Sequence, residues 1–239
     1  MYQVLLVVNR IAFIDLTITF LYALLFADVM KELIIAEKPD AAKNIAKALA
    51  EGEVQKKNNQ GVPYYEITRG SQDIIVACAV GHLYTVAAPK KTYTYPQFDT
   101  LWTETYNTDK GAAYTKKYVS TLKKLAKECN TFTVATDFDI EGEVIGYNVV
   151  KHICKQKDAY RMKFSTLTKE DVVQAYEEKH THIDWGQAFA GVTRHELDWY
   201  YGINLSSALM SAIKRAGMFK VLSSGRVQGP ALKMLCDKE

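Results

Sequence analysis

The sequence predicts an α/β fold, with a mostly parallel sheet flanked by helices, followed by the start of an α-helical domain. From Met30 onward, short apolar runs alternate with amphipathic segments, and the strand signals stop after Thr168. Strands that alternate with helices need crossover connections, which favours a parallel sheet. We expect residues 30–168 to form the α/β domain and residues 169–239 to form part of a helical domain.

The first half of the α/β domain shows two strands and one helix. Residues 31–37 read KELIIAE, a short apolar run that ends on a carboxylate. The helix that follows either is capped by Asp40 or has Pro39 in its first turn. Residues 73–83 predict a second strand, ended by Gly81. Four apolar residues fall on one face of the predicted helix: Ala42, Ile45, Ala46 and Leu49.

The second half continues the alternation after a polar interval. Residues 84–115 are rich in Thr, Tyr, Pro and Lys, and predict a long loop or insertion. An amphipathic helix is expected over 116–129, a buried strand over 131–136 and another helix over 143–154. Residues 160–167 close the domain, and every later apolar pattern is helical.

The first 29 residues differ from the rest of the chain. Residues 11–26 are strongly apolar, but Arg10, Asp15 and Asp28 flank or interrupt them. A membrane-spanning helix needs about 20 apolar residues, and a signal peptide needs a basic start and a small-residue cleavage site. We expect residues 1–29 to be an upstream extension before a natural start at Met30, with a membrane anchor as the alternative.

Composition excludes some classes and leaves others open. The chain is 48% hydrophobic and 24% charged, which are globular values and exclude a disordered protein. A formal net charge of +3 is too small to identify a nucleic-acid partner. The cysteines form no C-x-x-C pair, which argues against a zinc site and a disulfide framework. We expect buried, reduced thiols of a cytoplasmic protein at all four positions: Cys78, Cys129, Cys154 and Cys236.

Carboxylates gather at the ends of two predicted strands. The run DFDIEGE holds four of them: Asp137, Asp139, Glu141 and Glu143. If the strands are neighbours, Glu37 meets Asp137 and Asp139 in one crevice at the carboxyl edge of the sheet. Glu141 then lies near the start of the next helix. Hard oxygen ligands at this density favour Mg²⁺, and the alternative is an acidic surface turn neutralised by lysines.

Several segments resemble a known family. AEKP at 36–39 and TDFDIEGE at 136–143 resemble the Toprim domain, the metal-binding module shared by topoisomerases, bacterial-type primases and some nucleases. Three later segments resemble, in order, those that follow Toprim in type IA DNA topoisomerases, above all in the archaeal topoisomerase I and topoisomerase III branch: RMKFSTLT (161–168), TRHELDWYYGINLSSAL (193–209) and SSGRVQGPAL (223–232). They count against a Toprim primase or nuclease.

The resemblance implies a reaction and a set of roles. Type IA enzymes cut one DNA strand through a tyrosine, pass another strand through the break and reseal it without ATP, which relaxes negatively supercoiled DNA. Glu37 would protonate the departing 3′-oxygen and take the proton back on resealing. Lys38 would place a positive charge on the phosphate. Asp137, Asp139 and Glu141 would bind Mg²⁺, and no small-molecule nucleotide cofactor is expected.

The resemblance also implies contacts with single-stranded DNA. Arg194 and Asp198 would lie on the helical domain beside the DNA, although a surface ion pair at i,i+4 is the alternative. Arg226 and Gln228 fit a glycine-containing loop that approaches phosphates. His82, directly after a strand-ending glycine, fits a structural role and a DNA contact equally well.

The nucleophile of the family is not recognisable in these residues. It is a tyrosine in a G-x-I-[ST]-Y-x-R-T setting, and none of the 15 tyrosines stands in one. We therefore expect an amino-terminal portion, truncated in its helical domain and without the nucleophile, so that the isolated chain is doubtful as an enzyme. The alternative is a non-catalytic, Mg²⁺-dependent module that binds single-stranded DNA.

Overall fold

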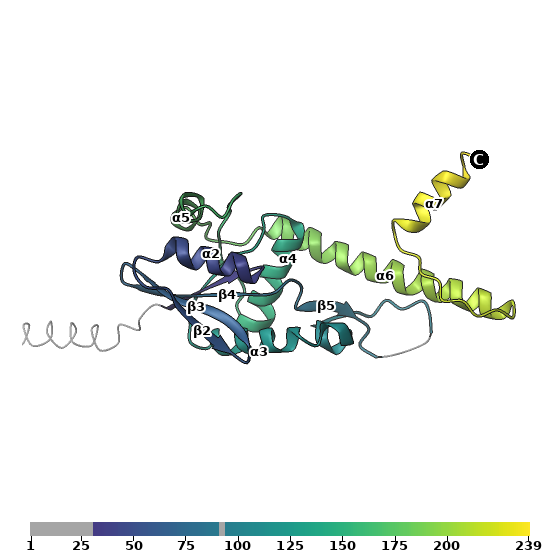
Figure 1. Ribbon diagram of the computed structural model, residues 1–239. Helices are drawn as coiled ribbons and strands as arrows, with labels where there is room; N and C mark the ends of the chain where they lie inside the picture. Colours follow the sequence, from purple (N-terminus) through teal and green to yellow (C-terminus); the bar gives the residue numbers. More distant parts are fainter. Residues whose placement is uncertain (1–30, 91–93) are drawn as a thin grey trace, which may run out of the picture.

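A computed structural model of the chain describes residues 31–90 and 94–239 (Figure 1). The extension predicted over residues 1–29, with its apolar run, lies outside the described residues. Within the described part of the chain, no helix is long and apolar enough to cross a membrane.

A six-stranded sheet forms the centre of the α/β body, in the order β2-β3-β4-β1-β7-β8. Its four parallel strands are β1 (Lys31–Ala36), β4 (Gln72–Cys78), β7 (Thr131–Ala135) and β8 (Tyr160–Arg161). The predicted mostly parallel sheet is thus confirmed. Its central strand, β1, is buried on both faces, which is why it reads as a continuous apolar run.

An antiparallel hairpin, absent from the sequence prediction, extends one edge of this sheet. It consists of β2 (Gln55–Asn59) and β3 (Val62–Arg69), and β3 pairs with β4. Its two-residue turn has positive φ at both Gln60 and Gly61, the conformation that matches the twist of hairpin strands.

The expectation of a long loop over residues 84–115 is wrong in part. This segment contains a second, two-stranded antiparallel sheet of β5 (Tyr84–Ala87) and β6 (Leu101–Glu104). Two short 3₁₀ turns follow, at Thr105–Asn107 and Lys110–Ala112. Each strand has only four residues, too few for a period of two to be recognised.

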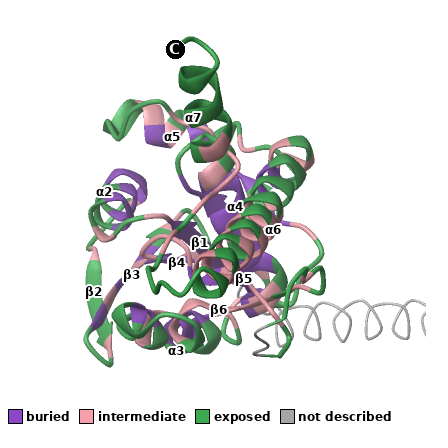
Figure 2. Ribbon diagram, turned by 90° about the vertical axis from the view of Figure 1, so that its right-hand side faces the viewer, coloured by how far each residue is buried: buried purple, intermediate pink, exposed green. Residues whose placement is uncertain are grey.

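Helices cover both faces of the main sheet, as Figures 1 and 2 show. The helices α2 (Pro39–Leu49) and α5 (Lys169–Glu177) pack on one face, in one hydrophobic cluster with β1 and β4. The helices α3 (Thr115–Leu125) and α4 (Ile140–Val149) pack on the other. Residues Val150–Cys154 continue α4 as a π-helix. Pro39 occupies the first turn of α2, so the second of the two sequence alternatives is correct.

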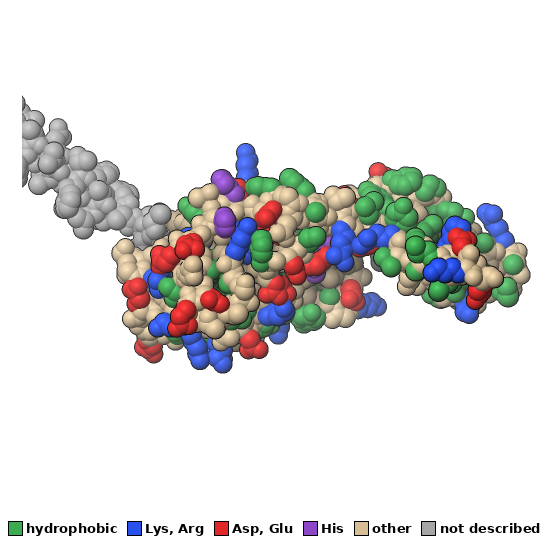
Figure 3. All heavy atoms as spheres, turned by 90° about the horizontal axis from the view of Figure 1, so that it is seen from above, with side chains coloured by type: hydrophobic (Ala, Val, Ile, Leu, Met, Phe, Trp, Pro, Cys, Tyr) green, Lys and Arg blue, Asp and Glu red, His purple; other side chains and the backbone are tan. Residues whose placement is uncertain are grey.

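The helical region begins with a long helix that packs on α4 and then leaves the body. This helix is α6 (Trp185–Arg215), and its buried residues, Ala188 and Gly191, lie near its start, whereas its outer part is intermediate or exposed (Figure 2). A loop then leads to α7 (Gln228–Cys236), which has no buried residue. Figure 3 shows hydrophobic side chains gathered over this end of the molecule. Met218 and Phe219, in the loop before α7, are exposed.

All four cysteines are free. Cys78 and Cys154 are buried as predicted, whereas Cys129 is half-buried and Cys236 is exposed, so the prediction of buried thiols is wrong for Cys236. Burial raises the pKa of Cys78 to about 11, which keeps that thiol protonated at neutral pH.

Candidate metal and nucleic-acid site

The carboxyl ends of β1 and β7 meet at one edge of the sheet. The two strands are parallel neighbours, with Ala36 opposite Ala135, so the residues that follow them are adjacent. The Nζ atom of Lys38 lies 3.1 Å from Glu37 Oε1 and donates a hydrogen bond of 3.0 Å to Asp137 Oδ2. The structure therefore brings Glu37, Lys38 and Asp137 together, as the strand ends predict.

Lys38 is a cation held between two carboxylates. The hydrogen bond to Asp137, followed by that to Glu37, raises the pKa of Lys38, so its ammonium stays charged at neutral pH. Its side chain is 62% exposed, whereas that of Glu37 is only 14% exposed. A partly buried carboxyl group, in its protonated form, can protonate an oxygen as it leaves phosphorus, while the accessible ammonium beside it neutralises the phosphate.

The carboxylate oxygens at this edge are ligands of the kind that divalent cations prefer. Carboxylates of Glu37 and Asp137 already share one positive charge, that of Lys38. Hard carboxylate oxygens with room for water are the surroundings that Mg²⁺ prefers. A pocket of ≈ 640 Å³ opens beside them, lined by Asp137, Asp139 and six further residues: Phe138, Lys163, Phe164, Ser165, Thr166 and Leu167.

Asp139 begins the next helix. Its Oδ1 accepts a hydrogen bond of 2.7 Å from the backbone N–H of Gly142, which makes Asp139 the N-cap of α4. A carboxylate here satisfies a free backbone donor and complements the positive end of the helix dipole. Asp139 is exposed beside Asp137, so a metal would bind a side chain that is already oriented by its cap.

Glu141 turns toward two histidines instead of the other acids. Among the described residues, one group of three possible metal ligands has all its ligand atoms within 4.8 Å of one another, and it consists of His82, Glu141 and His195. The structure therefore does not gather Asp137, Asp139 and Glu141 at one point. Their shared binding of Mg²⁺ remains a prediction.

A buried ion pair supports the turn between β7 and α4, which is called the acidic turn below. Arg161 and Glu143 are both fully buried, and Arg161 Nε donates a hydrogen bond of 2.8 Å to Glu143 Oε2. The guanidinium also donates to the backbone oxygens of Thr136, at 2.9 Å, and Asp137, at 3.0 Å. Glu143 Oε1 accepts from the backbone N–H of Asp184, just before α6. This pair fixes the turn that carries Asp137.

A row of ion pairs links the acidic turn to the helical region. Arg194 Nη1 lies 3.3 Å from Glu141 Oε1, and Arg194 Nε lies 3.9 Å from Asp198 Oδ2. Asp198 in turn accepts a hydrogen bond from Arg226, which raises the pKa of that guanidinium. Gln228 is exposed at the start of α7. Asp198 therefore contacts two arginines, Arg194 on its own helix and Arg226 from the later loop. The sequence alternative named only the first of these pairs.

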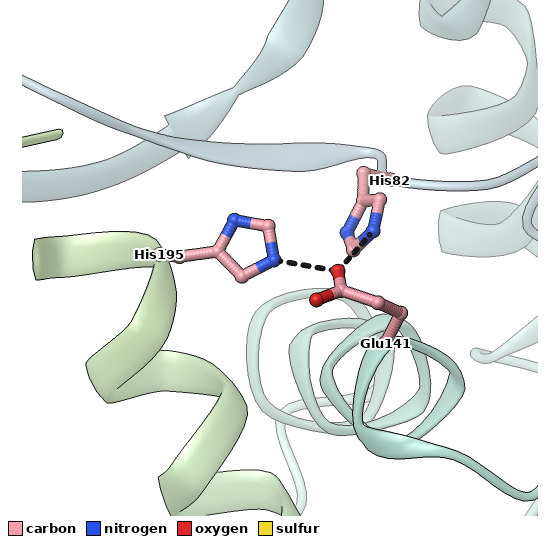
Figure 4. A group of neighbouring side chains, drawn as sticks. All are labelled: His82, Glu141 and His195. Atoms are coloured by element: carbon pink, nitrogen blue, oxygen red, sulfur yellow. Dashed lines mark hydrogen bonds and ion pairs between the residues drawn. The ribbon is translucent and has the colours of Figure 1, made fainter. Parts of the chain in front are cut away.

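Two histidines complete the surroundings of Glu141 (Figure 4). His82 Nε2 and His195 Nε2 lie 3.1 Å and 2.9 Å from the same oxygen, Glu141 Oε2. Burial, and then the neighbouring His195, lower the pKa of His82. The turn before His82 has positive φ at Val80 and Gly81, and for a β-branched residue such as Val80 this is a strained conformation that aims the histidine.

His195 is a site residue that the sequence does not reveal. It directly follows Arg194 in the segment TRHELD, but it lies 54 residues from Glu141 and no spacing rule joins them. Only the packing of α6 on α4 brings the two side chains together.

Two family models match the chain. The Toprim domain model matches residues 32–167, and a model described as DNA topoisomerase matches residues 182–239. The DNA topoisomerase 1 of Methanocaldococcus jannaschii is 51% identical over 215 residues, covering 89% of this chain and 28% of the relative. That of Pyrococcus horikoshii is 51% identical over 210 residues, covering 87% of this chain and 31% of the relative.

One solved structure shares the fold over most of the chain. Full-length topoisomerase I from Thermotoga maritima superposes with a TM-score of 0.56 at 25% identity, covering 86% of this chain and 29% of that one. The chain thus spans about three tenths of the length of the relatives it matches.

Proposed function

Since this chain belongs to the Toprim family and carries the Toprim-containing portion of a type IA DNA topoisomerase, we propose that it forms the phosphate- and metal-binding half of a site that cuts and rejoins one DNA strand. The proposal rests on the position of Lys38, whose ammonium lies between the carboxylates of Glu37 and Asp137 at the edge of the sheet. In this proposal residues 30–168 form the Toprim domain and residues 169–239 belong to the DNA-binding helical domain.

Glu37 and Lys38 act on the scissile phosphate in this proposal. Glu37 donates a proton to the 3′-oxygen as its bond to phosphorus breaks, and takes that proton back when the strand is resealed. Lys38 neutralises the phosphate, since its side chain is 62% exposed and its ammonium is accessible from solvent. Mg²⁺ held by Asp137, Asp139 and Glu141 would align the DNA ends for rejoining.

The helical region contributes contacts to DNA. Arg226 and Arg194 both contact Asp198, so the two guanidinium groups lie close together. Guanidinium groups grip phosphate oxygens through paired hydrogen bonds, which suits an unpaired DNA strand. The substrate proposed is therefore a single-stranded stretch within negatively supercoiled cytoplasmic DNA, and ATP is not required.

The residues of this chain bind the strand but do not attack it. None of the tyrosines stands in the sequence setting of the family's nucleophile. Tyr200 is occupied elsewhere, since its hydroxyl donates a hydrogen bond of 3.1 Å to the backbone oxygen of Phe98. A tyrosyl–DNA bond therefore needs a tyrosine from outside these 239 residues. The match of residues 182–239 to a DNA topoisomerase model favours this reading over a Toprim primase or nuclease.

Replacing Arg226 with glutamine is expected to weaken binding of the 239-residue protein to a fluorescent oligothymidylate in Mg²⁺. Loss of one phosphate contact should lower the slope of log K against log salt by about 0.7, the value for one phosphate of a single strand. Fluorescence anisotropy at several salt concentrations measures both quantities.

Lys233→Gln is the matched control, because Lys233 is likewise a cation paired with an aspartate, at 3.0 Å from Asp237. If both variants lost the same affinity for the oligonucleotide, Arg226 would contribute only non-specific electrostatic attraction. Tighter binding to duplex than to the single strand would contradict the proposed substrate.

A further inference from the structure

We propose that His82, Glu141 and His195 form a binding site for a transition-metal ion of the Zn²⁺ class, a site that shares Glu141 with the proposed magnesium site and differs from it in its two histidine ligands. The three ligands come from the loop after β4, from the first turn of α4 and from the middle of α6 (Figure 4). The site therefore joins the α/β body to the helical region.

The spacing of the ligand atoms fits a small tetrahedral ion. Zn²⁺ binds nitrogen and oxygen at about 2.0–2.2 Å, which places neighbouring ligand atoms of a tetrahedron roughly 3.3 Å apart. Glu141 Oε2 lies 3.1 Å from His82 Nε2 and 2.9 Å from His195 Nε2. The two histidine nitrogens lie within 4.8 Å of each other, so an ion bound by all three atoms takes the place of the two contacts that these nitrogens make with Glu141 Oε2.

The kind of ligand favours zinc over magnesium. Two imidazoles and one glutamate are a known zinc set that leaves a fourth position open, whereas Mg²⁺ prefers oxygen ligands alone. The cysteine spacing argues against a zinc site in the sequence, but this site uses no cysteine. Its ligands belong to three distant segments, so no spacing pattern could reveal it.

The surroundings hold the ligands in place. Glu141 Oε1, the oxygen that faces away from the histidines, lies 3.3 Å from Arg194 Nη1. The ring of Trp102 packs on His195, with centroids 5.8 Å apart. Nε2 is the atom that the His82 ring presents to the group, and its buried Nδ1 has no hydrogen-bond partner among the described residues, so packing and not an outer hydrogen bond orients this ring. Outer contacts therefore act on Glu141 and His195. Such outer contacts orient metal ligands and strengthen binding.

Zn²⁺ and Mg²⁺ would compete for Glu141. Glu141 is a proposed ligand of Mg²⁺ and also the central ligand of this group. Zn²⁺ bound by the two histidines would withdraw Glu141 from the magnesium site. We expect Zn²⁺ to weaken binding of the magnesium analogue Mn²⁺, and this effect should depend on His82 and His195.

Titration calorimetry of the 239-residue protein with Zn²⁺, in excess Mg²⁺, tests the site. We expect one equivalent to bind, and either His82→Asn or His195→Asn to weaken that binding by more than about 10-fold, since even an outer contact is worth roughly 10–100-fold. Co²⁺ in place of Zn²⁺ should give the visible absorption of a site with nitrogen ligands, and either variant should abolish it.

His182→Asn is the matched control. His182 lies outside the group and pairs with one carboxylate, 2.8 Å from Asp158, and its side chain is 70% exposed. Circular dichroism establishes that each variant is folded, and the two histidine variants test the site independently. Failure of Zn²⁺ to bind in excess Mg²⁺ overturns the proposal. The proposal is also overturned if His182→Asn loses as much Zn²⁺ affinity as the site variants, or if neither site variant loses any.

Discussion

The Arg161→Met variant is expected to lose about 3–5 kcal/mol of unfolding free energy, the usual effect of removing one partner of a buried ion pair. Arg161 and Glu143 have no exposed side-chain surface. The guanidinium also donates to the backbone oxygens of Thr136, Asp137 and Met162. Methionine fills much of the same volume but leaves a buried carboxylate and three carbonyl groups without their donor.

Urea denaturation of the 239-residue protein, followed by tryptophan fluorescence, measures this loss. Adding Glu143→Leu to Arg161→Met should restore part of the stability, because both charges then leave the interior. Lys57→Met is the surface control, since Lys57 pairs with Glu66 at 2.7 Å on the exposed edge hairpin and should keep the parent's midpoint. An Arg161→Met midpoint equal to that of Lys57→Met would show that the buried pair is not needed for stability.

The Gly142→Ala variant is expected to weaken Mg²⁺ binding and to destabilise the fold by about 1–3 kcal/mol, as overpacking does. A Cβ atom at Gly142 would lie 2.1 Å from the backbone oxygen of Asp137, far inside van der Waals contact. Arg161 Nη2 donates a hydrogen bond of 3.0 Å to that same oxygen, so moving the oxygen away from a Cβ disturbs this bond and the turn that carries Asp137. The glycine of the DFDIEGE run is therefore required by close packing.

Electron paramagnetic resonance of bound Mn²⁺, together with urea denaturation, checks both parts of this prediction. Gly202→Ala is the control, because a Cβ there has nothing within 4 Å and lies within α6. That variant should be more stable by about 0.5–1 kcal/mol, as expected for alanine in place of a helical glycine, with unchanged Mn²⁺ affinity. Mn²⁺ affinity that survives in Gly142→Ala would count against a metal site on this turn.

Apolar runs made most of the parallel sheet predictable, and polar strands were missed for a physical reason. β1 and β7 are buried on both faces and read as continuous apolar segments. β2, in contrast, is an edge strand with the sequence QKKNN and four exposed residues. Its lysines protect the edge from pairing with other chains, and they also remove the alternation by which a strand is recognised.

The site was predictable where it depends on strand ends and not where it depends on helix packing. Glu37 and Asp137 follow neighbouring strands, so their meeting needed only the sheet order. Asp139 could not be recognised as the cap of α4, because the same carboxylate fits a metal ligand equally well. His195 meets Glu141 through the packing of α6 on α4, which leaves no local pattern in the sequence.

Relaxation of plasmid DNA by a chimera shows whether these residues can supply the phosphate- and metal-binding half of the cleavage site. In this chimera residues 31–239 replace the matching segment of the DNA topoisomerase 1 of Methanocaldococcus jannaschii, which supplies the remainder of the enzyme. We expect it to relax negatively supercoiled plasmid with Mg²⁺ and without ATP, and Glu37→Gln to slow relaxation by at least about 100-fold, as for loss of a general acid. A folded chimera that leaves the plasmid supercoiled, or a Glu37→Gln chimera as fast as its parent, would contradict the account.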